Sequence, residues 1–455
     1  MRAFAAVVSA SGSTLVVSSL CAALSATGCG DDDLEGELSR FDGSDLPVAV
    51  VDTAGNAIRD EPKIDARLSL HAAPIEGLEA LEVPVAHFDG PIAIELRGYT
   101  SLEFPKKQYG FETRDPIGGD VDVSLLGLPP DSDWILHAPF MDKSLMRNHL
   151  AYELSRRMGR YAPRTEFVEL FLLDDGVDAP EIEHYRGVYV LTERIKRGPS
   201  RVDIERLEPG MLAEPDIRGG YLLEWTQSKR VEPSELGFST RHAEALLVRY
   251  PKPEDASDEQ LAWIHAYIDQ LEAALSLLER EPESEAFESF LDLDACVDYF
   301  LLSELLRNHD VFVASTFIHK ARAGKLVMGP QWDLDRAFGD VEFDGNWRPT
   351  GWLLPSRGWG RELFQSIRFR QRYVERWRAH RQSALDATQL GAVIRAATQK
   401  LAAAADRNFE KWLVLGRYVK VNRAPYSASF AEEIDKLTAW LEERAAWMDE
   451  HIEEL

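Results

Sequence analysis

The segment from Glu304 to Asp340 constrains the fold and the chemistry of this chain most strongly. It begins as the end of an amphipathic helix, breaks at Asn308-His309-Asp310, passes through a predicted hairpin and continues into the acidic segment Trp332–Asp335. Asp310 precedes the hairpin, and Asp333 and Asp335 follow it. Carboxylates on short, fixed loops are the oxygen ligands that hard divalent cations prefer. The segment therefore predicts a site that holds a divalent cation and orients a proton acceptor.

Residues 1–28 are predicted to be a targeting signal rather than part of the fold. Arg2 is their one charge, and an apolar run rich in Ala, Val, Leu and Ser ends in small residues before Cys29. This pattern is similar to a bacterial lipoprotein signal with lipidation at Cys29; an ordinary signal peptide or a weak membrane helix is the alternative. We expect an exported protein, attached by its lipid anchor to a bacterial membrane outside the cytoplasm.

The charge of the chain limits its partners. It carries 77 acidic and 51 basic residues, a formal net charge of −26. Such a chain repels nucleic acid and anionic lipid, so no nucleic-acid partner is expected, and a phosphate-handling role would need local clusters of Arg or Lys. Asp310, Asp333 and Asp335 could converge only at a cost without a cation, because like charges raise one another's pKa.

The order of predicted elements indicates an α+β fold with two lobes. Residues 29–45 are acidic and are interpreted as a tether, and residues 46–227 alternate or run apolar as strands do, with one helix after Asp142. A polar stretch up to Pro253 then leads into helices. We predict helices at about 258–281, 292–308, 361–385, 388–415 and 430–453. The expectation is a mixed, β-rich N-terminal lobe over 46–227 and a helical C-terminal lobe over 228–455, of which 361–455 is a helical extension.

Several common catalytic motifs are missing from the sequence. It has no Gly-x-Ser-x-Gly elbow, no His-Glu-x-x-His helix, no Gly-x-Gly-x-x-Gly and no Gly-x-x-x-x-Gly-Lys-Ser/Thr loop. A nucleotide would therefore have to be held by side chains and metal instead of a glycine cradle.

Basic groups occur in the predicted β-rich lobe. Arg97 precedes a turn, and the predicted strand 104–109 carries the adjacent Lys106 and Lys107. Neighbouring strand residues point to opposite faces, so at least one lysine should face inward and could form an anion site with Arg97. The alternative is two solvated surface lysines.

Seven blocks of residues, in order between about 90 and 340, are similar to the motifs of the CotH family of spore-coat-type atypical protein kinases. They are Arg97-Gly98 with Phe104-Pro105-Lys106-Lys107-x-Tyr109, Asp142-x-Ser144-x-x-Arg147-Asn148, Tyr185-x-Gly187-Val188-Tyr189-x-x-x-Glu193, Gly219-Gly220-Tyr221-Leu222-Leu223-Glu224, Asp298-Tyr299-Phe300, Asn308-His309-Asp310, and Gly329-Pro330-x-Trp332-Asp333-x-Asp335-x-Ala337-Phe338-Gly339.

This resemblance implies an atypical protein-kinase-like fold without a glycine-rich loop, whose two lobes enclose ATP and Mg²⁺ or Mn²⁺. Lys106 or Lys107 is the implied phosphate-gripping lysine, with Arg97 in support and Glu193 as the acid that orients it. Glu224 is a further candidate for the nucleotide site. From the residues alone, Glu193 could equally belong to a salt bridge at the end of a strand.

The same resemblance assigns the acidic residues. Asp310 corresponds to the aspartate that accepts the proton of an incoming hydroxyl, and Asp333 to the metal-binding aspartate. Asp335 and Asn308 are candidates for further metal ligands. Without the resemblance these residues could be a helix cap and turn formers, and Trp332 is expected to be a core residue.

The implied activity is transfer of the ATP γ-phosphate to Ser or Thr of a protein substrate, with the chain itself as one candidate substrate. ATP is scarce outside the cytoplasm, so a catalytically degenerate lipoprotein that binds nucleotide or acts as a structural scaffold is the alternative. Metal-dependent hydrolysis at the acidic cluster is a third possibility.

Overall fold

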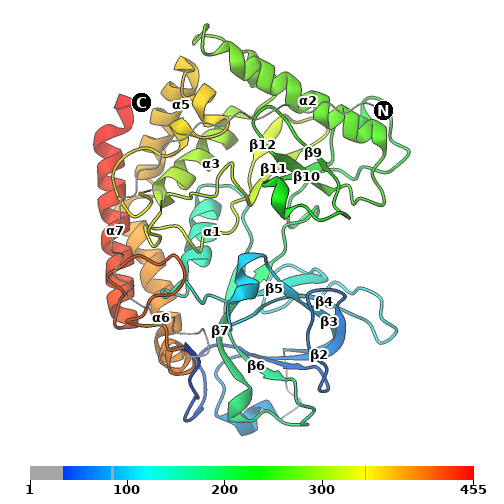
Figure 1. The fold of residues 1–455 in the computed structure, drawn as a ribbon, viewed down its shortest axis with the longest axis vertical. Coiled ribbons are helices and arrows are strands. Elements are labelled where there is room, and N and C mark those ends of the chain that lie inside the picture. The colour runs from blue at the N-terminus through cyan, green and yellow to red at the C-terminus, as the bar shows by residue number, and fades with distance from the viewer. Residues whose placement is uncertain (1–33, 83–86, 344) are drawn as a thin grey trace, which may run out of the picture.

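A computed structural model describes residues 34–82, 87–343 and 345–455 (Figure 1). The predicted signal and Cys29 lie outside these residues. Within the described part, no helix combines the length and the apolarity that a membrane crossing needs.

The strands are β1 Val48–Asp52, β2 Ile64–His71, β3 Phe88–Arg97, β4 Gln108–Thr113, β5 Asp133–His137, β6 Thr165–Leu173, β7 Tyr185–Glu193, β8 Tyr221–Thr226, β9 Gly237–Phe238, β10 Ala245–Tyr250, β11 Thr316–Lys320 and β12 Leu326–Met328. The helices are α1 Arg147–Arg157, α2 Asp258–Leu277, α3 Leu293–Leu306, α4 Gly360–Leu363, α5 Ile367–Arg381, α6 Ala387–Lys411 and α7 Phe430–His451.

The first seven strands form a closed barrel in the order β1-β2-β3-β4-β5-β7-β6. β1 closes the barrel by pairing parallel to β6, and it pairs antiparallel to β2. Ala49 and Val51 face the apolar interior of the barrel, whereas Val48 and Val50 pack on its outside against Phe41. Because β1 is buried on both faces, its sequence is a continuous apolar run instead of an alternating one.

The second sheet has five strands in the order β12-β11-β8-β10-β9. β8, which the sequence placed as the last strand of the N-terminal lobe, is central here and pairs antiparallel with both β10 and β11. β10 arises from the stretch expected to be a polar connection. The lobe boundary expected at residue 227 therefore lies between two strands of this sheet. The strands of the sheet come from both sides of that position in the sequence.

The helices and the hairpin around the acidic segment Trp332–Asp335 lie close to the positions predicted from the sequence. α2 begins at a capping box in which Ser257 accepts a hydrogen bond from the Gln260 backbone N–H, and α3 is capped by Asp292. α3 ends at Arg307, whose backbone is left-handed with φ 51°. The hairpin that was predicted after Asp310 is confirmed as β11 and β12.

The C-terminal helices reach the barrel, as Figure 1 shows for α6. Arg407 of α6 donates from Nε to Glu169 of β6 at 2.9 Å, and Asn408 accepts a hydrogen bond from the Val188 backbone N–H of β7 at 3.1 Å. The mixed α+β class is confirmed, with a closed barrel that the sequence did not predict. The kinase-like two-lobed arrangement stays a prediction.

Candidate functional site

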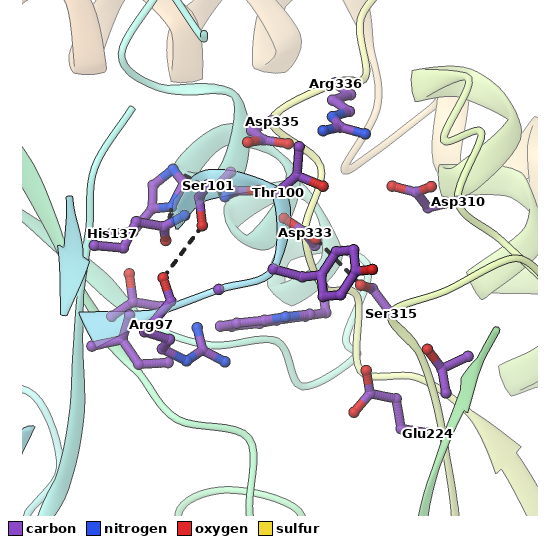
Figure 2. Close-up of a pocket in the computed structure, with 18 of the residues that line it drawn as sticks. Arg97, Thr100, Ser101, His137, Glu224, Asp310, Ser315, Asp333, Asp335 and Arg336 are labelled. Atoms are coloured by element: carbon purple, nitrogen blue, oxygen red, sulfur yellow. Dashed lines mark hydrogen bonds between the residues drawn. The ribbon is translucent and has the colours of Figure 1, made fainter. Parts of the chain in front are cut away.

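A cavity of about 290 Å³ lies where the barrel, the second sheet and the segment after β12 meet. The barrel contributes residues at the ends of β3 and β5, and the second sheet contributes residues of β8, β10 and β11. Figure 2 shows Asp310, Asp333, Asp335 and Arg336 on one side of this cavity and Arg97 on another. The structure thus brings together side chains that lie more than two hundred residues apart in the sequence.

The loops fix the positions of two of the aspartates. After α3, the Asn308 side chain accepts a hydrogen bond from the Asp310 backbone N–H at 3.1 Å, so Asn308 shapes the loop but does not line the cavity itself. Asp333 has a left-handed backbone with φ 59°. Its N–H donates to the Tyr152 hydroxyl at 3.2 Å, and Ser315 Oγ donates to Asp333 Oδ2 at 3.2 Å.

The electrostatics separate Asp310 from the other two carboxylates. Burial and the charge of Asp310 raise the pKa of Asp333, and burial and the charge of Asp333 raise the pKa of Asp335 to about 8. Burial also opposes ionisation of Asp310, but His309, with Nε2 3.2 Å from Asp310 Oδ1, and the charges of Arg336 and Arg230 together hold the pKa of Asp310 below its usual value. The surroundings of Asp310 therefore favour its ionised form, whereas those of Asp333 and Asp335 favour their neutral forms.

The donor chemistry fits a small hard cation. Among the residues that the structure describes, no group of three or more His, Cys, Asp and Glu side chains is arranged to hold a metal ion. Mg²⁺ in phosphoryl-transfer sites is usually held by one or two protein carboxylates and completed by water and substrate phosphates. The carboxylates of Asp333 and Asp335 match that smaller requirement.

An aromatic and cationic wall faces the acidic residues. The Arg97 guanidinium lies 5.2 Å from the centre of the Trp332 ring, which in turn stacks on Tyr152. Trp332, expected in the core, is partly buried and packs against the core, and it also lines the cavity. Glu224 also lines the cavity and accepts a hydrogen bond from Arg249 Nε at 2.7 Å.

The structure places the two lysines differently from the sequence expectation. They lie before β4, and neither lines the cavity. Lys106 is 1% exposed and its Nζ donates to the Val188 carbonyl at 2.7 Å and to Asn408 Oδ1 at 2.8 Å. Lys107 donates to the Leu102 carbonyl at 2.6 Å. Lys106 therefore ties the barrel to α6 in this structure.

Glu193 likewise has other partners than a lysine. Its carboxylate accepts hydrogen bonds from Arg164 at 2.9 Å and from Arg201 at 2.8 Å, and it is fully buried. This arrangement matches the alternative role of Glu193, a salt bridge at the end of a strand. Glu193 does not line the cavity.

Sequence reasoning missed several residues of the site. They include Arg230 and Arg249 from the stretch interpreted as polar, Arg336 from the acidic segment, and Asn148 and His137. Arg336 and Asn148 stand inside the quoted motifs, so the motifs could have pointed to them. Nothing in the local pattern marks Arg230 or Arg249.

A chain of hydrogen bonds connects the barrel to the acidic segment through Asn148. Its Oδ1 accepts from the Leu334 backbone N–H at 2.6 Å, and its Nδ2 lies 3.3 Å from His137 Nε2. His137 Nδ1 lies 3.0 Å from Gln108 Oε1. A neutral His137 protonated on Nδ1 satisfies every contact, because it donates to Gln108 and accepts from Asn148.

We expect Asn148→Ala to destabilise the chain by about 1–3 kcal/mol, because the buried Leu334 N–H and His137 Nε2 each lose a partner. Urea denaturation measures the change. Asn56→Ala is the matched control, since the exposed Asn56 makes a hydrogen bond only to the Thr53 carbonyl of a turn, and it should shift stability by about 0.5 kcal/mol or less. Equal effects of the two substitutions would contradict the bridging role.

His137 should make stability depend on pH. Burial, with the charges of Lys106 and Arg97, lowers its pKa to about 3 in the folded chain, against 6.5 as the ordinary value. The unfolded chain therefore binds the extra proton first, so stability is complete above pH 6.5 and falls by up to about 1.4 kcal/mol per unit as the pH drops toward 3. His137→Gln should reduce this slope in urea denaturation at pH 7 and pH 5, while His265→Gln, on the surface of α2, should leave it unchanged.

Comparison with known proteins identifies the family. No curated protein matches the chain. The family model described as CotH kinase protein matches residues 94–448, a range that includes the cavity and all of its acidic residues. This match covers most of the sequence, and the chain therefore belongs to the CotH kinase family.

Proposed function

We propose that the chain is an atypical kinase that transfers the γ-phosphate of ATP to Ser or Thr of a protein substrate. The observation that carries this proposal is the convergence of Asp310, Asp333 and Asp335 with arginines in one cavity of a CotH kinase family member. Phosphoryl transfer needs positioning and charge neutralisation more than covalent chemistry, and this cavity offers groups for both.

Asp310 is the proposed proton acceptor. His309 favours its ionised form, and its side chain lines the cavity. A carboxylate in this state can orient the incoming hydroxyl and accept its proton as the new bond to phosphorus forms. His309 acts through Asp310 as a positioning residue.

Asp333 and Asp335 are the proposed ligands of Mg²⁺ or Mn²⁺. A bound divalent cation would neutralise the phosphate oxygens of ATP and remove the cost of two ionised, buried carboxylates. Ser315 and Tyr152 hold Asp333 in place through its side chain and backbone respectively.

Arginines are proposed to take the place of a phosphate-gripping lysine. Arg97, Arg230, Arg249 and Arg336 line the cavity from separate segments of the chain. The described ranges contain no ion-pair partner for Arg336, although its charge acts on Asp310, Asp333 and Asp335. Guanidinium groups grip phosphate oxygens through paired N–H donors, so Arg336 is free to engage the transferred group.

The proposal is tested by incubating the full chain with ATP and Mg²⁺ or Mn²⁺ and mapping phosphate by mass spectrometry. We expect phosphate on Ser or Thr, either of the chain or of an added protein, and none after chelation of the metal. Release of inorganic phosphate without a phosphoprotein would support hydrolysis in place of the kinase reaction.

A nucleotide-binding role without transfer is the second candidate. It is favoured by the burial of Lys106 and its hydrogen bonds to Val188 and Asn408, so that no lysine is among the described residues that line the cavity. Metal-dependent ATP binding in calorimetry, combined with no phosphate transfer to any protein, would select this role.

A further inference from the structure

A second cavity, separate from the candidate site, lies between α2 and the β11–β12 hairpin, which Figure 1 shows close to one another. Its volume is about 720 Å³, within the range of ligand-binding sites. Trp263 and Tyr267 of α2 line it, and Lys320 and the hairpin turn line it from the other element.

Lys320 is a buried cation that makes no ion pair with any acidic side chain of the described residues, although the charge of Glu205 acts on it from a distance. The residue is 3% exposed, and its Nζ donates to the carbonyls of Ala321 at 3.2 Å and Gly324 at 2.9 Å. The ammonium lies 4.9 Å from the centre of the Tyr267 ring and 5.4 Å from that of Trp263. An ammonium has three hydrogens, so one stays available to a ligand. Burial and the nearby Arg218 lower its pKa to about 8, a cost that a bound anion would relieve.

The surroundings of Lys320 are positive in a strongly acidic chain. Arg218, Arg322 and Lys325 also line the cavity, and Glu214 is the one acidic residue among its described lining residues, in a chain that carries −26 as a whole. Arg322 is paired with Asp216 at 3.2 Å and the charge of Glu205 acts on Lys320, so Lys320, Lys325 and Arg218 supply the excess of positive charge. Lys325 is exposed, and Arg218 makes only a long ion pair with Glu214, at 3.7 Å. A local excess of positive charge attracts anionic groups.

We propose that this cavity is a docking site for an acidic segment of a polypeptide, whose anionic group contacts Lys320 while its chain lies along Trp263 and Tyr267. The cavity is much larger than one phosphate ion, and its aromatic wall offers contact area beyond a single charge. The anionic group is a carboxylate or a phosphorylated hydroxyl, both of which offer the same oxygen acceptors.

The docking site and the candidate active site lie on opposite faces of one sheet. Phe317 of β11 lines the candidate site, and Lys320 of the same strand lines the second cavity. Successive strand residues point to opposite faces, so these two side chains, three positions apart, lie on opposite faces. Docked polypeptide and ATP should therefore bind independently. A substrate role for the docked chain rests on the proposed function, but the docking itself does not.

Fluorescence anisotropy of the full chain with labelled Glu-rich, phosphoserine-containing and Gln-rich peptides tests the proposal. We expect at least one anionic peptide to bind more tightly than the Gln-rich one, and the tighter of the two identifies carboxylate or phosphate. The double variant Arg218→Ser, Lys325→Ser should raise Kd about tenfold, because it removes two positive charges that attract the anionic peptide. Both side chains are exposed, so the fold should be unaffected. Lys252→Ser, an exposed lysine outside the cavity, should leave Kd unchanged, and so should saturating ATP with Mg²⁺.

Binding of anionic peptides no better than of the Gln-rich peptide, or an unchanged Kd in the double variant, would overturn the docking site. Competition by ATP would place the peptide in the candidate active site and overturn it equally. Absence of phosphate transfer by the wild type contradicts only the kinase proposal, so the two failures are distinguishable.

Discussion

Asp310→Asn is expected to lower kcat for phosphate transfer by a factor of about 10²–10⁴ while the Kd for ATP changes by less than about threefold. The asparagine keeps the shape of the side chain but cannot accept the proton of the incoming hydroxyl. Asp310 lines the cavity beside the proposed metal ligands without being one of them, so nucleotide binding should persist. Steady-state kinetics with a protein acceptor and calorimetry with ATP measure the two quantities.

Asp292→Asn is the matched control for this prediction. Asp292 caps the N-terminus of α3, the same helix that leads to Asp310, by accepting a hydrogen bond from the Ala295 N–H at 2.8 Å. Asparagine caps helices about as well as aspartate, so kcat should stay at the wild-type value. A kcat for Asp310→Asn within about threefold of this control would rule out Asp310 as the proton acceptor.

Arg444→Met is expected to destabilise the chain by about 3–5 kcal/mol, the largest stability effect that we predict. Arg444 and Glu304 are both fully buried, and Arg444 Nη2 donates to Glu304 Oε1 at 2.8 Å. The substitution leaves the Glu304 charge buried without its cation, although the N–H groups of Leu353 and Leu354 still donate to it. Chemical denaturation followed by circular dichroism measures the loss.

Two comparisons test the cause of that loss. Arg157→Met removes an ion pair to Glu153 near the surface of α1 and should cost about 1 kcal/mol or less. Adding Glu304→Gln to Arg444→Met should recover part of the stability, because the uncompensated charge is then gone. The ion-pair explanation would be wrong if Glu304→Gln lowered the stability of Arg444→Met by as much as it lowers that of the wild type.

The parts of the fold that the sequence predicts well are those with local signals. α2 is marked by its capping box, α3 by Asp292, and the hairpin by its position between polar breaks. Asp310, Asp333 and Asp335 lie on the loops before and after this hairpin. They therefore meet at one cavity because of structure that is local in the sequence. The barrel and the position of β8 depend on pairings between distant strands, which no local pattern specifies.

The lysines show why the rest of the site could not be predicted. Because Lys106 and Lys107 are adjacent, the sequence indicates that one of them faces inward. It does not indicate which residues that lysine contacts. The Lys106 side chain meets Asn408, which is 302 residues away in the sequence. Similarly, the motif that contains Asp142 and Arg147 forms a buried ion pair that extends to Glu433 of α7. Partners of this kind become visible only when the tertiary structure is known.

Radiolabel transfer from [γ-³²P]ATP tests the central claim most directly, with wild type, Asp310→Ala and Asp333→Ala measured side by side. We predict that only the wild type labels itself or an added protein, and only with Mg²⁺ or Mn²⁺ present. Asp310 supplies the proton acceptor and Asp333 the metal-binding carboxylate in the same cavity, so either loss should remove transfer. Equal labelling of all three proteins, or no labelling of the wild type with either metal, would contradict the proposed kinase.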